Sequence, residues 1–478
     1  MAVTTTTPGL KRELGGWTTT AVVIGNMIGS GVFLLPAALA VVALEYGSGS
    51  LLAWVVTGIG AMLLAAVFAS LGRAYPRTGG PYVYVRRAFG DFMGFQTAWG
   101  YWIAAWVGNA AIATAFVGAL AVFIPRLGAE TTNGHVWAYV TAIGTIWLLT
   151  LINASGVKQT GAVQLVTTIL KFVPLALIGV IGLFFMDTGN FGEFAPNGYG
   201  LGNGLIGGIT AAMALTLWAF IGLESATVPA EEVKDAERSI PRATIWGTLG
   251  TAVLYAVATI AIMGILPLTV LRDSTAPFAD AATEVFGGAF WGKVVALVVM
   301  ISTFGALNGW ILLQGRVPYA AAKDGLFPKA FGKLGRNGTP VFGLVASSIL
   351  ITGLMALNYN KNLVDNFTFV ILLATLVTLV PYAFSAAADA YLMITDRTAF
   401  VGRRLVRDVV VAAVGFAYAV WTMIGSGMEI IGQGFVLWMI GVPVFVWMRW
   451  ARRHEHEVIV PFEHPEIVPT TPKEPVNA

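Results

Sequence analysis

Stretches of about 20 consecutive, mostly apolar residues recur along the whole chain, and each is long enough to cross the hydrocarbon core of a bilayer as one helix. Of the 478 residues, 57% are hydrophobic and only 11% are charged, whereas roughly 25% are charged in a soluble globular protein. The sequence therefore predicts an all-α integral membrane protein with twelve transmembrane helices. They cover approximately residues 17–44, 50–72, 92–123, 136–153, 163–186, 205–229, 244–267, 290–315, 341–358, 367–394, 408–427 and 430–449.

The Lys and Arg residues are distributed unevenly between the two sides of the membrane. Because the number of spans is even, both termini lie on the same side as the even-numbered loops. Of the 28, 23 fall in the N-terminal segment, the even-numbered loops and the C-terminal tail, and 4 fall in the odd-numbered loops. Since cytoplasmic loops carry the excess of Lys and Arg, we expect a protein of the cytoplasmic (inner) membrane with both termini cytoplasmic. The termini comprise a segment over 1–16 and a Pro-rich, solvated tail over 450–478, with the membrane domain over 17–449 between them.

Two of the stretches, the first and the sixth, contain glycine near their centres. In the first stretch these residues are Gly25, Gly29 and Gly31. In the sixth, Gly222 is followed after one residue by Glu224. Such glycines allow close packing between helices, or they mark helices that are interrupted at the bilayer midplane. The second interpretation predicts a five-plus-five inverted repeat, over about 17–186 and 205–394, with helices 11 and 12 over 408–449 outside it.

An interrupted helix leaves backbone groups without partners. The N–H groups of Ser30, Gly31 and Val32 would lie at the positive end of a restarting helix and suit a carboxylate. Carbonyl groups near Met27, Trp218 and Ile221 would suit an ammonium group. A zwitterion would bridge the two breaks.

The chain lacks the residues and motifs that several functional classes require. There is no cysteine, and the four histidines lie in one loop and the C-terminal tail. No phosphate-binding GxxxxGK[ST] motif and no GxSxG or HExxH motif occurs. We therefore expect neither an ATP-driven pump nor an enzyme, and neither a cofactor nor a metal.

The chain also resembles the amino acid–polyamine–organocation transporters, and among them the bacterial arginine/agmatine and basic amino acid exchangers. The resemblance extends from about residue 20 to 385. It rests on GNMIGSGVFLLPA, PRTGGPYVYVRRAFG, FQTAWGYWIAAWVGN, LWAFIGLES, PAEEVKDAERSIPRAT and AAAKDGLFPKAFGKLGRNGTP. It implies a LeuT-like fold with broken helices 1 and 6 and transport of a small-molecule substrate by alternating access.

The resemblance also implies roles for individual residues. Trp218 would gate the site, Tyr101 and Glu224 would belong to the gate network, and Ile221 would offer its backbone. Trp310 would stack on the side chain of a basic substrate. The remaining substrate contacts would come from Asn26, Met27, Gly29, Ser30 and Gly31 at the backbone end of the substrate, and from Ala104, Ala105 and Asn109 at its side-chain end.

Two positions depart from the arginine/agmatine exchangers. A serine that helps to hold the guanidinium group is replaced by Ala374, with Thr375 and Thr378 nearby. Lys171 lies in the middle of the fifth stretch, where other members of the family carry a lysine in place of a sodium ion. Lys171 is either a proton-coupling site or a fixed peg that hydrogen-bonds to the loose carbonyls of span 1. Glu224 is a second proton-coupling candidate, or it simply hydrogen-bonds across the break.

We therefore predict a secondary active exchanger of basic amino acids and related amines. Two alternatives remain open: a proton-coupled permease for neutral or broad-range amino acids that uses Lys171, and a non-transporting amine sensor or channel. Helices 11 and 12 would be peripheral or form a homodimer contact, and no nucleic acid partner is expected.

Overall fold

The chain is helical throughout the parts that the structure describes. This computed structural model describes residues 14–29, 31–77, 79–128, 133–155, 171–172, 175–228, 230–358, 362–400 and 404–454. The α-helices are α1 Gly16–Met27, α2 Gly31–Tyr46, α3 Ala53–Ala74, α4 Pro81–Ala121, α5 Gly134–Ala154, α7 Leu205–Trp218, α8 Ala236–Ile265, α9 Leu268–Leu271, α10 Pro277–Phe286, α11 Ala289–Lys323, α12 Val341–Leu357, α13 Leu363–Thr395, α14 Leu405–Gly425, α15 Met428–Met439 and α16 Gly441–His454.

The long apolar helices coincide with the predicted stretches. Within the described residues, 9 helical segments are long and apolar enough to cross a membrane, and three shorter apolar helices cover Leu175–Phe185, Leu205–Trp218 and Val341–Leu357. The prediction of an all-helical membrane protein is therefore confirmed for the described residues. Part of the predicted fifth stretch, residues 163–170 and 173–174, lies outside the described residues. The sequence reading did not anticipate α9 and α10, two short helices after α8.

The first predicted span is divided into two helices. The α1 helix ends at Met27 and α2 begins at Gly31, with Ile28 at a non-helical ψ of 76° between them. In the sixth span, α7 ends at Trp218, and turns follow up to the short 3-10 helix Ser225–Thr227. The prediction of interrupted helices is therefore confirmed at both positions.

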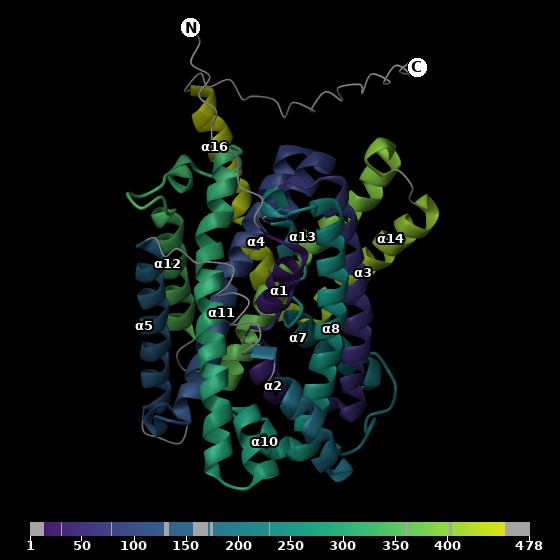
Figure 1. Ribbon diagram of the computed structural model, residues 1–478, viewed down its shortest axis with the longest axis vertical. Coiled ribbons are helices and arrows are strands. Elements are labelled where there is room, and N and C mark those ends of the chain that lie inside the picture. The colour runs from purple at the N-terminus through teal and green to yellow at the C-terminus, as the bar shows by residue number, and fades with distance from the viewer. Residues whose placement is uncertain are drawn as a thin grey trace, which may run out of the picture.

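The helices pack in two groups around these breaks (Figure 1). One group contains α1, α2, α3, α7 and α8, in which α8 packs against α1 and α3. The other contains α4, α5, α11 and α12, in which α11 packs along α4. The α13 helix contacts α4 extensively and also contacts α2, α3 and α7, so it joins the two groups.

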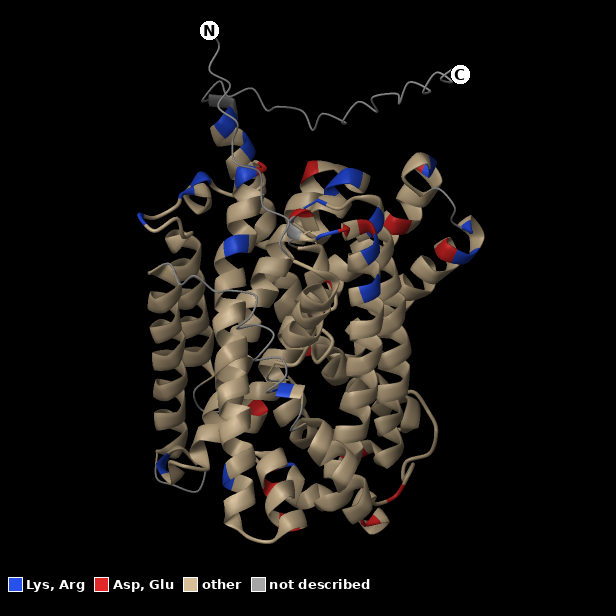
Figure 2. Cartoon of the chain, viewed as in Figure 1, with Lys and Arg blue, Asp and Glu red and all other residues tan. Residues whose placement is uncertain are grey.

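Lys and Arg gather at one end of the described helices, the end at which α16 finishes (Figure 2). The opposite end carries fewer of them. This asymmetry is the one on which the predicted orientation rests, and the cytoplasmic placement of the termini stays a prediction.

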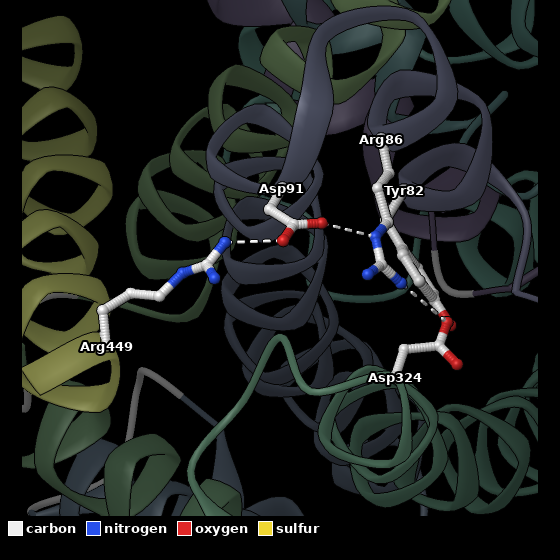
Figure 3. Close-up of polar contacts among 5 residues, drawn as sticks. All are labelled: Tyr82, Arg86, Asp91, Asp324 and Arg449. Carbon is white, nitrogen blue, oxygen red and sulfur yellow. Dashed lines mark hydrogen bonds and ion pairs between the residues drawn. The ribbon is translucent and has the colours of Figure 1, made fainter. Parts of the chain in front are cut away.

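A charged cluster at this end fixes the first turns of α4. Gly90 interrupts α4 at φ 82° and ψ −177°, so the segment before it folds back against the segment after it. Asp91 accepts from Arg86 Nε at 2.8 Å and from Arg449 at 2.5 Å. Arg86 also lies 3.9 Å from Asp324, whose carboxylate accepts from the Tyr82 hydroxyl at 3.1 Å (Figure 3). The cluster thus joins α4, the end of α11 and α16.

A second cluster uses the neighbouring arginine. Asp396, at the end of α13, accepts from Arg87 at 2.9 Å, from the Tyr75 hydroxyl at 2.8 Å and from the Thr398 hydroxyl at 2.9 Å. Partial burial alone would raise the pKa of Asp396. These hydrogen bonds and the charge of Arg87 outweigh it and hold the pKa below its ordinary value of 3.8.

Asp396→Asn is expected to lower the thermal unfolding midpoint at pH 7, because it removes a charge-assisted pairing worth about 1 kcal/mol. The carboxylate contributes stability above the pKa that it has in the unfolded chain, and this contribution is lost as the pH falls through the lowered pKa of the folded state. The difference between variant and wild type should therefore shrink as the pH falls below about 4. Melting curves of both proteins in detergent from pH 7 to pH 3 measure it, and a pH-independent difference would contradict the assignment.

Candidate functional site

A small internal cavity lies where α4, α11 and α13 meet the second break. Its size is about that of one water molecule, so a larger occupant requires its walls to move apart. Each of the four segments that line it contributes residues named in the sequence analysis. The lining residues are Tyr101, Ala104, Ala105, Gly108 and Ile112 of α4, Trp218 and Ile221 at the end of α7 and beyond it, Trp310 of α11 and Thr378 of α13.

The Trp218 indole is held between two glycines of different helices. A Cβ added to Gly31 would lie 2.8 Å from Trp218 Cδ1, and one added to Gly108 would lie 2.7 Å from Trp218 Cη2. Any larger residue at either position would push the ring out of place, since real Cβ atoms do not approach so closely. Gly31 thus makes room for the Trp218 ring, and its predicted contact with a substrate stays a prediction.

The two broken segments touch each other directly. Gly222 has φ +111°, which disfavours every residue with a side chain, and its backbone lies against that of Asn26. A Cβ at Gly222 would lie 3.1 Å from the carbonyl carbon of Asn26 and 3.2 Å from its oxygen. Asn26 is therefore placed at the crossing of the two breaks, and it does not line the cavity.

The carbonyl groups expected to be spare have local partners. The Gly29 N–H donates to Met27 O at 2.7 Å, and the Ile221 N–H donates to Trp218 O at 3.2 Å. Each oxygen keeps a second lone pair for another donor. Met27 is buried and does not line the cavity. Ser30 lies outside the described residues, so its expected contact stays a prediction.

Glu224 forms the centre of a buried hydrogen-bond network. Its Oε1 accepts from the Tyr101 hydroxyl at 2.5 Å, while its Oε2 accepts from the Tyr382 hydroxyl and from the Gly222 N–H. The side chain is completely buried. The carboxylate thereby connects α4, α13 and the second break, directly behind the Tyr101 ring that lines the cavity. The sequence reading named Tyr101 and Glu224 but missed Tyr382, whose only signal was a hydroxyl beside Pro381 in an apolar helix.

Lys171 contacts the first break. The side chain is 2% exposed, and its Nζ donates to Gly25 O at 3.4 Å. This contact agrees with the reading of Lys171 as a peg on the carbonyls of span 1. It leaves the proton-coupling reading as a prediction.

Only some of the residues that were predicted to contact the side chain of the substrate lie together at the cavity. Ala104, Ala105 and Trp310 line the cavity, whereas Asn109 is fully buried behind it. Ala374 does not line the cavity. Its carbonyl group accepts from the hydroxyl of Thr378 at 2.7 Å, and Thr378, one turn further along α13, takes the place on the wall.

Acidic and histidine side chains do not gather as a metal site requires: no group of three or more was found among the described residues. The cavity is lined by the aromatic side chains of Tyr101, Trp218 and Trp310, by small and aliphatic residues and by Thr378.

Comparison with known proteins places this arrangement in a family. The model of the amino acid permease family matches residues 14–448. An arginine/ornithine antiporter of Pseudomonas aeruginosa is 32% identical over 459 residues, 94% of this chain and 92% of that protein. The putrescine transporter PotE of Escherichia coli K12 is 32% identical over 438 residues, 90% of this chain and 95% of that protein.

A Bacillus subtilis protein named as an inferred arginine/ornithine antiporter is 35% identical over 462 residues, 91% of this chain and 96% of that protein. The names of these relatives describe antiporters of arginine and ornithine and a transporter of putrescine. The match and the relatives cover nearly the whole membrane domain, and the chain therefore belongs to the amino acid permease family of the amino acid–polyamine–organocation superfamily.

Proposed function

We propose that the chain is a secondary active exchanger of basic amino acids and their related amines. The observation that carries this proposal is that Trp310 lines the same cavity as Trp218 and Ile221 of the second break. The names of the three relatives support it, since arginine, ornithine and putrescine all carry a cationic side-chain or chain-end group.

The substrate would lie across the two breaks. Its carboxylate would accept from the N–H groups at the start of α2, at Gly31 and Val32. Its α-ammonium group would meet carbonyl groups near Met27 and Ile221. The cationic end would lie over Trp310, in a cation–π contact worth ~2 kcal/mol when water is excluded. A diamine without a carboxylate would keep the last two contacts.

Alternating access would come from relative movement of the two helix groups. The breaks in the first and sixth spans support a five-plus-five inverted repeat as the basis of this movement. Twelve membrane helices with both termini in the cytoplasm complete the proposed topology. A homodimer contact through helices 11 and 12, which correspond to α14 and to α15 with α16, is part of the same proposal.

The test is uptake of labelled arginine into proteoliposomes that are preloaded with arginine, ornithine, agmatine, alanine or buffer alone. Uptake only against a basic internal substrate is expected. Uptake driven solely by an inward proton gradient would favour the permease alternative. Specific binding without any counterflow would favour a sensor or channel.

The proton-coupled alternative rests on the buried Lys171. If it holds, Lys171→Ala should abolish uptake driven by a pH gradient, because the variant has no amine at the first break to bind and release a proton. If Lys171 is only a peg, the variant should lose stability and retain its response to the gradient. Initial rates of labelled alanine uptake at two imposed gradients measure the difference.

Lys293→Ala is the matched control, since Lys293 is an exposed lysine on α11. The same loss in both variants would show that removal of a positive charge, and not this location, caused it.

A further inference from the structure

A row of buried polar side chains runs behind the cavity through four helices. Asn109 Nδ2 of α4 donates to Gln314 Oε1 of α11 at 2.7 Å. Gln314 Nε2 lies 3.2 Å from Ser348 Oγ of α12, which lies 2.7 Å from Thr150 Oγ1 of α5. All four side chains are completely buried. Such a row is costly in an apolar interior unless its members are hydrogen-bonded, so its orientation is strongly determined.

One backbone carbonyl fixes the direction of the whole row. Gln314 Nε2 lies 3.4 Å from Leu344 O, a group that can only accept a hydrogen bond. The nitrogen of the Gln314 amide must therefore face Leu344, because its oxygen would be repelled there. The Gln314 oxygen then faces Asn109, and only the nitrogen of the Asn109 amide can meet it. The Asn109 carbonyl oxygen is left on the other side.

The geometry of α4 places Asn109 at the edge of the helix face that lines the cavity. Asn109 lies four residues after Ala105 and three before Ile112, so all three lie on one face of the helix. Ala105 and Ile112 both line the cavity. The Oδ1 atom of Asn109 is buried and has no hydrogen-bond partner among the described residues.

We propose that Gln314 is a positioning residue that selects substrates with a hydrogen-bond donor at the side-chain end. It holds the Asn109 amide so that Oδ1, and not the NH₂ group, faces the substrate. An ammonium or guanidinium group pairs with this oxygen when the walls open around the substrate. A neutral apolar side chain leaves it buried and unpaired, so the site rejects that substrate. This inference rests on the function proposed above.

The orientation of the Asn109 amide decides selectivity. A reversed amide would present its NH₂ group to the ammonium or guanidinium group of the substrate, which can itself only donate hydrogen bonds. Without Gln314 the Asn109 amide has no fixed direction. Gln314→Leu keeps the volume and removes the hydrogen bonds to Asn109 and Ser348. Gln314→Glu, with its buried carboxyl group protonated, keeps an acceptor for Asn109 Nδ2 and a donor toward Leu344 O.

The experiment measures half-saturation and maximal rate for external ornithine, arginine and alanine in ornithine-loaded proteoliposomes. Gln314→Leu is expected to raise half-saturation for the two basic substrates roughly 10-fold, as loss of one hydrogen bond to a charged group predicts. The maximal rate and the half-saturation for alanine should change less than about threefold. Gln314→Glu should restore most of the discrimination between basic and neutral substrates.

Asn109→Leu should act through the same contact. It should give a similar rise in half-saturation, and the double variant Asn109→Leu/Gln314→Leu should be no worse than Asn109→Leu alone. Independent, multiplying effects would overturn the proposal. A fall in maximal rate with unchanged half-saturation would also overturn it, since that is the result expected of a purely structural residue.

The control is Asn153→Ala, which removes another amide pair from the same helix group, between the buried Asn153 and the half-buried Asn308 at 2.8 Å. It is expected to leave the discrimination between ornithine and alanine unchanged; an equal loss would overturn the proposal. Ser348→Ala serves if the leucine variant does not reach the membrane, and it should shift half-saturation in the same direction by a smaller factor.

The two proposals fail in different ways. If the wild type exchanges ornithine and Gln314→Leu leaves the discrimination intact, only this inference is overturned. If the wild type transports no basic substrate from any loading, both are overturned.

Discussion

Gly222→Ala is expected to reduce exchange by roughly 10-fold or more and to lower the thermal unfolding midpoint. The residue needs φ +111°, and its added Cβ would press on the backbone of Asn26 at 3.1 Å. The conformational strain alone costs ~1–3 kcal/mol. Backbone atoms of the other break cannot rotate away as a side chain can, so the two broken segments would have to separate. Counterflow rates and melting curves in detergent measure the two effects.

Gly427→Ala is the control that introduces the backbone strain of Gly222→Ala without a contact to another segment. Gly427 has φ +84°, and a Cβ there would meet nothing within 4 Å. It should lower stability through strain alone and leave exchange close to the wild-type rate. Equal losses of exchange in both variants would show that the crossing of Gly222 and Asn26 has no special part in transport.

Glu224→Ala is expected to abolish most exchange. It leaves the hydroxyl groups of Tyr101 and Tyr382 buried without their acceptor. Each such group costs ~1–3 kcal/mol. Since 2 kcal/mol alone changes a population roughly 30-fold, the closed arrangement in which the three side chains meet would become rare. Counterflow of labelled ornithine measures the loss.

Three milder variants identify the cause. Glu224→Gln keeps the shape and one acceptor oxygen, so it should retain more exchange than the alanine variant. Tyr382→Phe and Tyr101→Phe each remove one hydroxyl donor and should give intermediate losses. If exchange by Glu224→Gln no longer varies with pH while wild-type exchange does, Glu224 carries a proton in the cycle. If Glu224→Ala keeps more than half of wild-type exchange, the gate network is wrong.

The positions of the helices followed from the sequence, because a membrane imposes a length on every apolar helix. The predicted stretch 341–358 agrees with α12 within one residue, and 136–153 agrees with α5 within two. The breaks were also predictable, since glycine weakens a helix through local backbone entropy. In α4 the sequence predicted only the apolar part from residue 92; the charged turn before Gly90 has no such hydropathy signal.

The sequence by itself determined the membrane class, the places where the helices break and, through resemblance, most of the residues around the cavity. These depend on hydropathy and glycine content, which are properties of short segments. Only the tertiary structure decided that Tyr382 shares Glu224 with Tyr101, that Thr378 replaces Ala374 on the cavity wall, and that Gln314 orients Asn109. Each of these joins residues of different helices, and the rotation of one helix against another is fixed by the packing of all of them together.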